Sequence, residues 1–152
     1  MHPMLNIAVR AARRAGTVIV RGHRRLDEVK FERKGHHDYV SQVDRDAESA
    51  IIDTLSTAFP DHQILAEESG SSGQSDHVWI IDPLDGTLNF LHGYPQFAVS
   101  IALTVKGRLD QAVIYDPMRD ELFTASRGAG AQLNGHRMRV ARCLQLDNAL
   151  LA

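Results

Sequence analysis

The spacing of apolar residues along this chain changes near Asp61. Before that point, apolar side chains recur at three- and four-residue steps over residues 4–25 and again over residues 43–58. This spacing predicts two amphipathic helices. Ser41 and Asp44 have the spacing of a capping box at the start of the second one.

Beyond Asp61, short apolar runs alternate with turn residues, which is typical of β-strands. The expected strands are residues 63–66, 78–81, 97–106, 111–115, 121–125 and 131–133. An earlier strand is expected over residues 28–34, with a turn at 34–38, and residues 69–76 are interpreted as a mobile polar loop. Short links between strands indicate an antiparallel meander. The predicted fold class is α+β, with two N-terminal helices packed on a largely antiparallel sheet.

With 43% apolar and 24% charged residues among 152, the chain is expected to form a single domain over residues 1–152. The only cysteine, Cys143, excludes an internal disulfide framework and a cysteine-rich zinc site. No apolar stretch reaches the roughly 20 residues that span a bilayer, and arginines interrupt the N-terminal apolar run, so a cytoplasmic protein is expected. The apolar ending at residues 149–152 leads us to expect that the chain stops before a packing partner.

Charge is unevenly distributed. Residues 1–34 carry a net charge of +6, residues 35–85 of −10 and residues 86–152 of +2, giving −2 in total. This balance excludes a globally basic nucleic-acid-binding protein. Six arginines fall opposite the apolar face of the first predicted helix: Arg10, Arg13, Arg14, Arg21, Arg24 and Arg25. A solvated helix face is the favoured interpretation, and a ridge that binds RNA or a protein partner, such as the transcription machinery, is the alternative.

Carboxylates cluster in the acidic middle segment, next to predicted strand ends. Glu67 and Glu68 follow one strand, residues 82–87 follow the next, and Asp44 opens the second helix. Each position alone has an ordinary explanation, namely a solvated strand end, a turn or a helix cap. Together these hard oxygen ligands favour a Mg²⁺ site.

The turn after residues 78–81 contributes two carboxylates and a candidate phosphate-binding segment to that site. Pro83 stiffens it, so Asp82 and Asp85 are expected to face one pocket. Gly86 lets a backbone approach a ligand closely. If Gly86 and Thr87 open a helix, their N–H groups are placed to hold a phosphate.

Residues Trp79-Ile80-Ile81-Asp82-Pro83-Leu84-Asp85-Gly86-Thr87-Leu88-Asn89-Phe90 resemble the signature of the inositol monophosphatase family. Glu67-Glu68-Ser69 matches the glutamate motif of that family, and residues 34–44 match the region before it. Residues 1–14 resemble the start of its bacterial, extragenic-suppressor type. The resemblance covers essentially the whole chain and implies the amino-terminal half of a layered αβαβα sugar-phosphatase fold.

The resemblance implies a metal site. Glu67 and Asp82 would bind a first Mg²⁺ together with the backbone carbonyl of Leu84. Asp82 would bridge to a second ion that Asp85 also binds, and Glu68 would lie beside the metals. Two or three Mg²⁺ ions are expected, with Mn²⁺ as a possible substitute.

The resemblance also assigns the reacting groups. Gly86 and Thr87 would contact the phosphate, Asp85 would contribute to substrate binding, and Thr87 with Asp44 would orient and activate the attacking water. The implied reaction is hydrolysis of inositol 1-phosphate or a similar polyol or sugar phosphate. A nucleotide bisphosphate or fructose bisphosphate is an alternative substrate, and a homodimer is expected.

Two departures from the family pattern stand out. Leu88 replaces a threonine that the family usually has directly after the water-orienting threonine, which removes one hydroxyl near the site. The carboxyl-terminal half, with an aspartate for the second metal ion and most contacts to the alcohol, is not in this sequence. The 152-residue chain is therefore expected to be weakly active or inactive.

Overall fold

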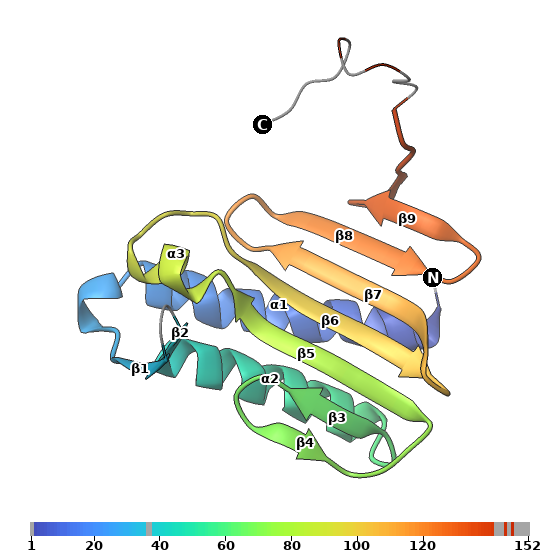
Figure 1. The fold of residues 1–152 in the computed structure, drawn as a ribbon, viewed down its shortest axis with the longest axis horizontal. Coiled ribbons are helices and arrows are strands. Elements are labelled where there is room, and N and C mark those ends of the chain that lie inside the picture. Colours follow the sequence, from blue (N-terminus) through green and yellow to red (C-terminus); the bar gives the residue numbers. More distant parts are fainter. Residues whose placement is uncertain (1, 36–37, 142–144, 146, 148–152) are drawn as a thin grey trace.

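The computed structural model of the protein describes residues 2–35, 38–141, 145 and 147. Two long helices, α1 (Pro3–His23) and α2 (Gln42–Ala58), lie side by side against one face of a large sheet (Figure 1). Pro3 suits the first turn of α1, because its missing N–H needs no partner there. The capping box predicted at the start of α2 is confirmed.

The described part of the sheet has eight strands in the order β10-β9-β8-β7-β6-β5-β3-β4. Their bounds are β3 (Gln63–Ala66), β4 (Gly70–Ser72), β5 (His77–Asp85), β6 (Ala98–Val105), β7 (Arg108–Asp116), β8 (Glu121–Ser126), β9 (Gly130–Leu133) and β10 (His136–Arg137). Neighbouring strands run antiparallel except β3 and β5, which run parallel. The predicted α+β class is confirmed.

A small hairpin and a short helix lie at one end of the sheet. The hairpin consists of β1 (Phe31–Gly35) and β2 (Asp38–Ser41), and β2 leads directly into α2. The short helix α3 (Thr87–Leu91) follows β5 and contacts β2. Residues that are distant in sequence therefore gather at this end (Figure 1).

The hydrophobic core lies between the helices and the sheet. Along β6 every second side chain is buried, namely Val99, Ile101 and Leu103, as the alternation of a strand requires. Gly16 lets α1 approach β7, since a Cβ there would come 2.5 Å from the Tyr115 ring. On the opposite face of the sheet, Leu65, Ile80 and Ile114 are 44%, 41% and 47% exposed, so that face carries apolar surface.

Three sequence predictions need correction. The strand expected over residues 28–34 begins only at Phe31, because a 3-10 turn occupies Leu26–Glu28. The loop expected over residues 69–76 contains β4, because Gly70 adopts a φ of 78° and turns the chain back along β3. The strand expected over residues 78–81 continues to Asp85 through an irregularity in its pairing with β6.

Some expectations concern residues outside the described part of the chain. These are the middle of the turn at 36–37, Cys143 and the apolar ending at 149–152. None of the described helices combines the length and the apolar character needed to cross a bilayer.

Candidate active site

The parallel pairing of β3 and β5 brings two acidic segments together. Ala66 is the register partner of Ile81, and the next residue, Glu67, donates its N–H to the Ile81 carbonyl at 3.1 Å. Because parallel strands end at the same edge of a sheet, Glu67 comes to lie beside Asp82. A strand order with β3 elsewhere in the sheet would have separated these two carboxylates.

A bulge in β5 sets the direction of the second acidic residue. Asp82 pairs with Ser100 of β6 and Asp85 with Ala98, so β5 has one residue more than its partner between these pairs. Pro83 sits inside the bulge, where a residue without an N–H loses no ladder bond. The N–H of Leu84 donates to Oδ1 of Asp82 at 3.2 Å and fixes that carboxyl group.

The carboxyl group of Asp82 is strongly perturbed. Burial, then the hydrogen bond with Glu67, and then the negative charges of Glu67 and Asp85 raise the pKa of Asp82 to about 7. Two carboxyl groups share a hydrogen bond only when one of them carries a proton. The site therefore concentrates negative charge that a proton or a cation must compensate.

The metal ligands proposed from the sequence are only partly brought together. Across residues 2–35, 38–141, 145 and 147, no three His, Cys, Asp or Glu side chains form a ready-made metal site. Glu67 is hydrogen-bonded to Asp82, whereas Asp85, which is exposed like Glu67, acts on Asp82 through its charge. The donor set is nevertheless all oxygen, which is the chemistry that a hard divalent cation requires.

Asp44 and Thr87 meet across the site. The Thr87 hydroxyl lies 2.8 Å from Oδ1 of Asp44 and 3.0 Å from the Leu84 carbonyl oxygen. Asp44 is only 1% exposed, and its Oδ2 accepts bonds from the Ser41 N–H, at 2.8 Å, and from the Ser41 hydroxyl. One buried carboxylate therefore caps α2 and holds Thr87, so the two interpretations of Asp44 as cap and as site residue are compatible.

Gly86 forms the corner between β5 and α3. It adopts a φ of 94°, and a Cβ there would come 2.9 Å from the Gln96 carbonyl oxygen and 3.2 Å from Cβ of Phe97. A larger residue would be strained on both counts. The helix expected at Thr87 is present, but it has only five residues. Leu88 is 37% exposed in its first turn.

Two residues that the sequence analysis did not single out for the site shape the glutamate motif. Glu48 of α2 is 3% exposed and accepts the N–H groups of Glu68 and Ser69 at 2.8 and 2.9 Å. Lys34 forms a close ion pair with Glu68. Burial raises the pKa of Glu68, while the bond and charge of Lys34 oppose that rise. The signal for Glu48 was its position four residues after Asp44, on the buried face of α2.

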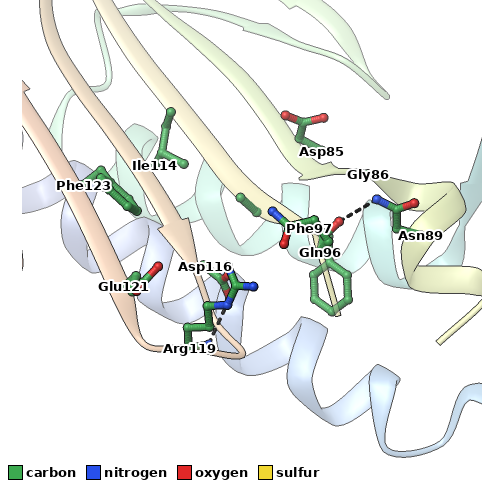
Figure 2. A pocket seen from close by; sticks show the side chains of 11 residues that line it. Asp85, Gly86, Asn89, Gln96, Phe97, Ile114, Asp116, Arg119, Glu121 and Phe123 are labelled. Atoms are coloured by element: carbon green, nitrogen blue, oxygen red, sulfur yellow. Dashed lines mark hydrogen bonds and ion pairs between the residues drawn. The ribbon is translucent and has the colours of Figure 1, made fainter. Parts of the chain in front are cut away.

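A cavity of about 370 Å³ adjoins the site (Figure 2). It begins at Asp85 and Gly86 and extends past Phe97 toward Arg119 and Glu121. At its far side Arg119 lies 3.8 Å from Asp116, and near Gly86 the Asn89 amide donates to the Gln96 carbonyl at 2.8 Å. The cavity presents both hydrogen-bond donors and acceptors next to the acidic segment.

All six arginines that the sequence places opposite the apolar face of the first helix are exposed, as expected for a solvated helix face: Arg10, Arg13, Arg14, Arg21, Arg24 and Arg25. Arg13 pairs with Asp120 at 2.9 Å and lies over the Tyr115 ring. Arg14 donates to the Thr54 hydroxyl at 2.7 Å. Arg25 lies 4.0 Å from Glu28.

Comparisons with known proteins show which proteins this chain is similar to. The Nus factor SuhB of Escherichia coli strain K12 is 54% identical over 154 residues, covering 100% of this chain and 58% of that protein. The crystal structure of extragenic suppressor protein SuhB from Bartonella henselae has a TM-score of 0.91 at 49% identity and covers 93% of this chain and 56% of that chain.

The Thermotoga maritima IMPase structure has a TM-score of 0.82 at 37% identity, covering 91% of this chain and 54% of that chain. The chain thus spans little more than half the length of these relatives. The profile of the Inositol monophosphatase family matches residues 1–152. This chain belongs to the inositol monophosphatase family.

Proposed function

We propose that this chain carries the metal- and phosphate-binding part of a Mg²⁺-dependent phosphomonoesterase. The observation that carries the proposal is the continuous set of contacts from Glu67 through Asp82 and Leu84 to Thr87 and Asp44. It joins the paired carboxylates to the buried carboxylate–hydroxyl pair. Inositol 1-phosphate, or a similar polyol or sugar phosphate, is the substrate that family membership supports.

The oxygen ligands fit Mg²⁺, and Mn²⁺ is a chemically similar substitute. Glu67, Asp82 and Asp85 would hold the ions through carboxylates, and Leu84 through its carbonyl. Burial, the hydrogen bond with Glu67 and the negative charges of Glu67 and Asp85 raise the pKa of Asp82, and a bound cation would compensate that charge. Bound Mg²⁺ would make water more acidic and neutralise charge on the transferring phosphoryl group.

Thr87 and Asp44 would orient the attacking water. The single hydroxyl proton of Thr87 is directed to Asp44 or to the Leu84 carbonyl. Its oxygen is therefore left to accept a hydrogen bond from a water molecule, which fixes the direction of the lone pair on that water. Gly86 has no side chain to obstruct a phosphate beside Thr87.

The test is phosphate release from inositol 1-phosphate across a Mg²⁺ series, with wild type and Asp82→Asn compared at saturating Mg²⁺. We expect slow, Mg²⁺-dependent turnover that the substitution abolishes. Because turnover of this chain is expected to be slow, binding of inorganic phosphate with and without Mg²⁺ is measured in parallel by calorimetry. Turnover or phosphate binding that is unchanged in Asp82→Asn would contradict the proposal. A panel that adds a nucleotide bisphosphate and fructose bisphosphate distinguishes the alternative substrates.

A second candidate function is binding to RNA within the transcription machinery. It is supported by the designation of the Escherichia coli relative as a Nus factor and by the exposed Arg10, Arg21 and Arg24. We expect RNA binding that weakens with salt and with Arg21→Ala and Arg24→Ala. Arg13→Ala is a useful comparison because Arg13 is already paired with Asp120. An RNA affinity that is unchanged in Arg21→Ala and Arg24→Ala would exclude this candidate function.

A further inference from the structure

Glu48 connects helix α2 to the turn that carries the glutamate motif. Each of its carboxylate oxygens accepts one backbone N–H, from Glu68 at 2.8 Å and from Ser69 at 2.9 Å. Glu48 itself is 3% exposed, whereas Glu68 is half-buried and Ser69 is exposed, so the two bonds are partly buried. Hydrogen bonds from two backbone N–H groups to one carboxylate are among the stronger hydrogen-bonding arrangements in a protein.

The turn is therefore held on both sides of Glu67. On one side the Glu67 N–H continues the pairing of β3 with β5 by donating to the Ile81 carbonyl at 3.1 Å. On the other side Glu48 fixes the next two N–H groups. The side chain of Glu67 is left exposed beside Asp82.

Within this turn, the side chain of Glu67 is hydrogen-bonded to Asp82. The side chain of Glu68 turns to Lys34 instead. A change in the backbone of the turn would exchange these roles and place the lysine-paired glutamate at the metal position. The hydrogen bonds to Glu48 oppose that change, because a different backbone conformation would move the N–H groups of Glu68 and Ser69 away from the Glu48 carboxylate.

We propose that Glu48 is a positioning residue that keeps Glu67, rather than Glu68, beside Asp82 for binding of a divalent cation. This inference rests on the proposed function, since it concerns the same site. Glu48 acts through the backbone of the turn and touches neither the cation nor the substrate. Asp44 and Glu48, one helical turn apart on α2, thus orient two different parts of the site.

Glu48→Gln is a sharp probe of this role. It preserves the size of the side chain but replaces one acceptor oxygen with an NH₂ group, which faces a backbone N–H as donor against donor. Thr54→Val is the matched control, because it removes a buried polar group of the same helix that bonds to Arg14 and to the Ala50 carbonyl, away from the turn. Glu48→Asp keeps both acceptor oxygens and shortens the side chain, so it serves as the conservative variant.

The experiment combines Mn²⁺ binding by calorimetry with hydrogen exchange of the Glu68 and Ser69 amides. We expect Glu48→Gln to raise the Mn²⁺ dissociation constant about tenfold or more, with a smaller rise for Glu48→Asp. Both amides should exchange faster in Glu48→Gln, and Thr54→Val should leave Mn²⁺ affinity and both amides unchanged even if it lowers the melting temperature. If Glu48→Gln does not fold, the comparison rests on Glu48→Asp.

Equal Mn²⁺ affinity in wild type and the folded Glu48 variants overturns the positioning role and leaves the proposed function intact. Equal weakening in Thr54→Val also overturns it, because general destabilisation would then explain the effect. Absence of Mn²⁺ binding by wild type overturns the metal-dependent function and, with it, the positioning role.

Discussion

The hydroxyl oxygen of Thr87 lies 2.8 Å from Oδ1 of Asp44, although the two residues are 43 positions apart. Asp44 is buried in the first turn of α2, and Thr87 opens α3. The contact therefore fixes the short helix after β5 against the start of a long one. It also offers an acceptor for the hydroxyl proton of Thr87.

Removing that hydroxyl should affect both stability and chemistry. Thr87→Val preserves shape but takes a donor from a buried carboxylate, which we expect to lower the free energy of unfolding by about 1–3 kcal/mol. Phosphate release, which is expected to be slow at most in this chain, should fall below detection. The control is Thr104→Val, because the Thr104 hydroxyl makes only a long, weak hydrogen bond of 3.5 Å to the Val78 carbonyl. Urea unfolding of both variants gives the comparison, and equal losses would show that the Asp44 contact has no special role.

Neutralising Asp82 should stabilise the metal-free protein while removing its response to Mg²⁺. The pKa of Asp82 is raised to about 7, whereas an unfolded aspartate ionises near its ordinary value of 3.8. The stability associated with the protonated group is thus present below pH 3.8 and is lost as pH rises through about 7. Because Asp82 is only half-buried, solvent screening reduces the effect to about 1–2 kcal/mol.

Unfolding in a chelating buffer at pH 5 and pH 8 measures this effect. Wild type should lose stability relative to Asp82→Asn between the two pH values. The addition of Mg²⁺ should then stabilise wild type alone. A parallel pH dependence of the two proteins would show that Asp82 is not the titrating group.

The elements that could be predicted from the sequence are those in which apolar residues recur at a regular spacing within one short segment. Both helices follow from apolar residues at helical spacing, and α2 begins at the predicted cap. The irregular end of β5 was not predictable, because Asp82, Pro83 and Gly86 together have the composition of a plain turn. The parallel pairing of β3 with β5 could not be predicted either. The alternation of apolar and polar residues shows which face of the sheet a residue occupies, but not which strand lies beside its own.

The site was predicted residue by residue only through family resemblance, and its assignments remain predictions. From the residues alone, the carboxylates could be grouped, and Asp82 and Asp85 could be expected to face one pocket, but the role of each residue could not be assigned. Glu48 was missed because an acidic residue in an acidic segment suggests solvent exposure, whereas its partners are backbone N–H groups that carry no sequence signal. The pairing of Glu68 with Lys34 was missed for a similar reason, as it joins a hairpin to a turn.

Gly86 should tolerate no side chain. Gly86→Ala combines a φ of 94° with a Cβ placed 2.9 Å from a backbone oxygen. We expect a loss of about 2–4 kcal/mol, from backbone strain plus steric displacement. Gly107→Ala is the matched control, because Gly107 has a φ of 73° and open space around its Cβ position. Thermal unfolding should show a distinctly smaller loss for Gly107→Ala, and equal losses would indicate that φ alone matters at Gly86.

A cluster of stacked rings at the start of β5 should make the protein less stable at mildly acidic pH than at neutral pH. Nδ1 of His62 accepts the Trp79 indole N–H at 3.1 Å, and the His62 and His77 rings stack 4.6 Å apart. Burial, and then the charge of His77, lower the pKa of His62 from 6.5, while Asp61 opposes this. The folded state therefore binds fewer protons, so stability present above pH 6.5 is lost as pH falls through the lowered pKa.

The melting temperature from pH 7.5 to pH 5, followed by fluorescence of Trp79, tests this cluster. Trp79 is the single tryptophan, so the signal is local. His62→Gln keeps an acceptor group and should flatten the profile, and the effect should be below about 1 kcal/mol because the ring is partly exposed. A profile that is equally steep in His62→Gln would assign the pH dependence to other groups.

Glu67 and Asp82, brought together by parallel strands, are proposed to hold a divalent cation. Anomalous scattering from a crystal grown with Mn²⁺ locates such an ion, with Asp82→Asn crystals as control. We predict an anomalous peak in contact with the carboxylates of Glu67 and Asp82 in wild type and its loss in the variant. Wild-type density with no peak there, or with the two carboxylates turned to separate parts of the surface, would contradict the claim.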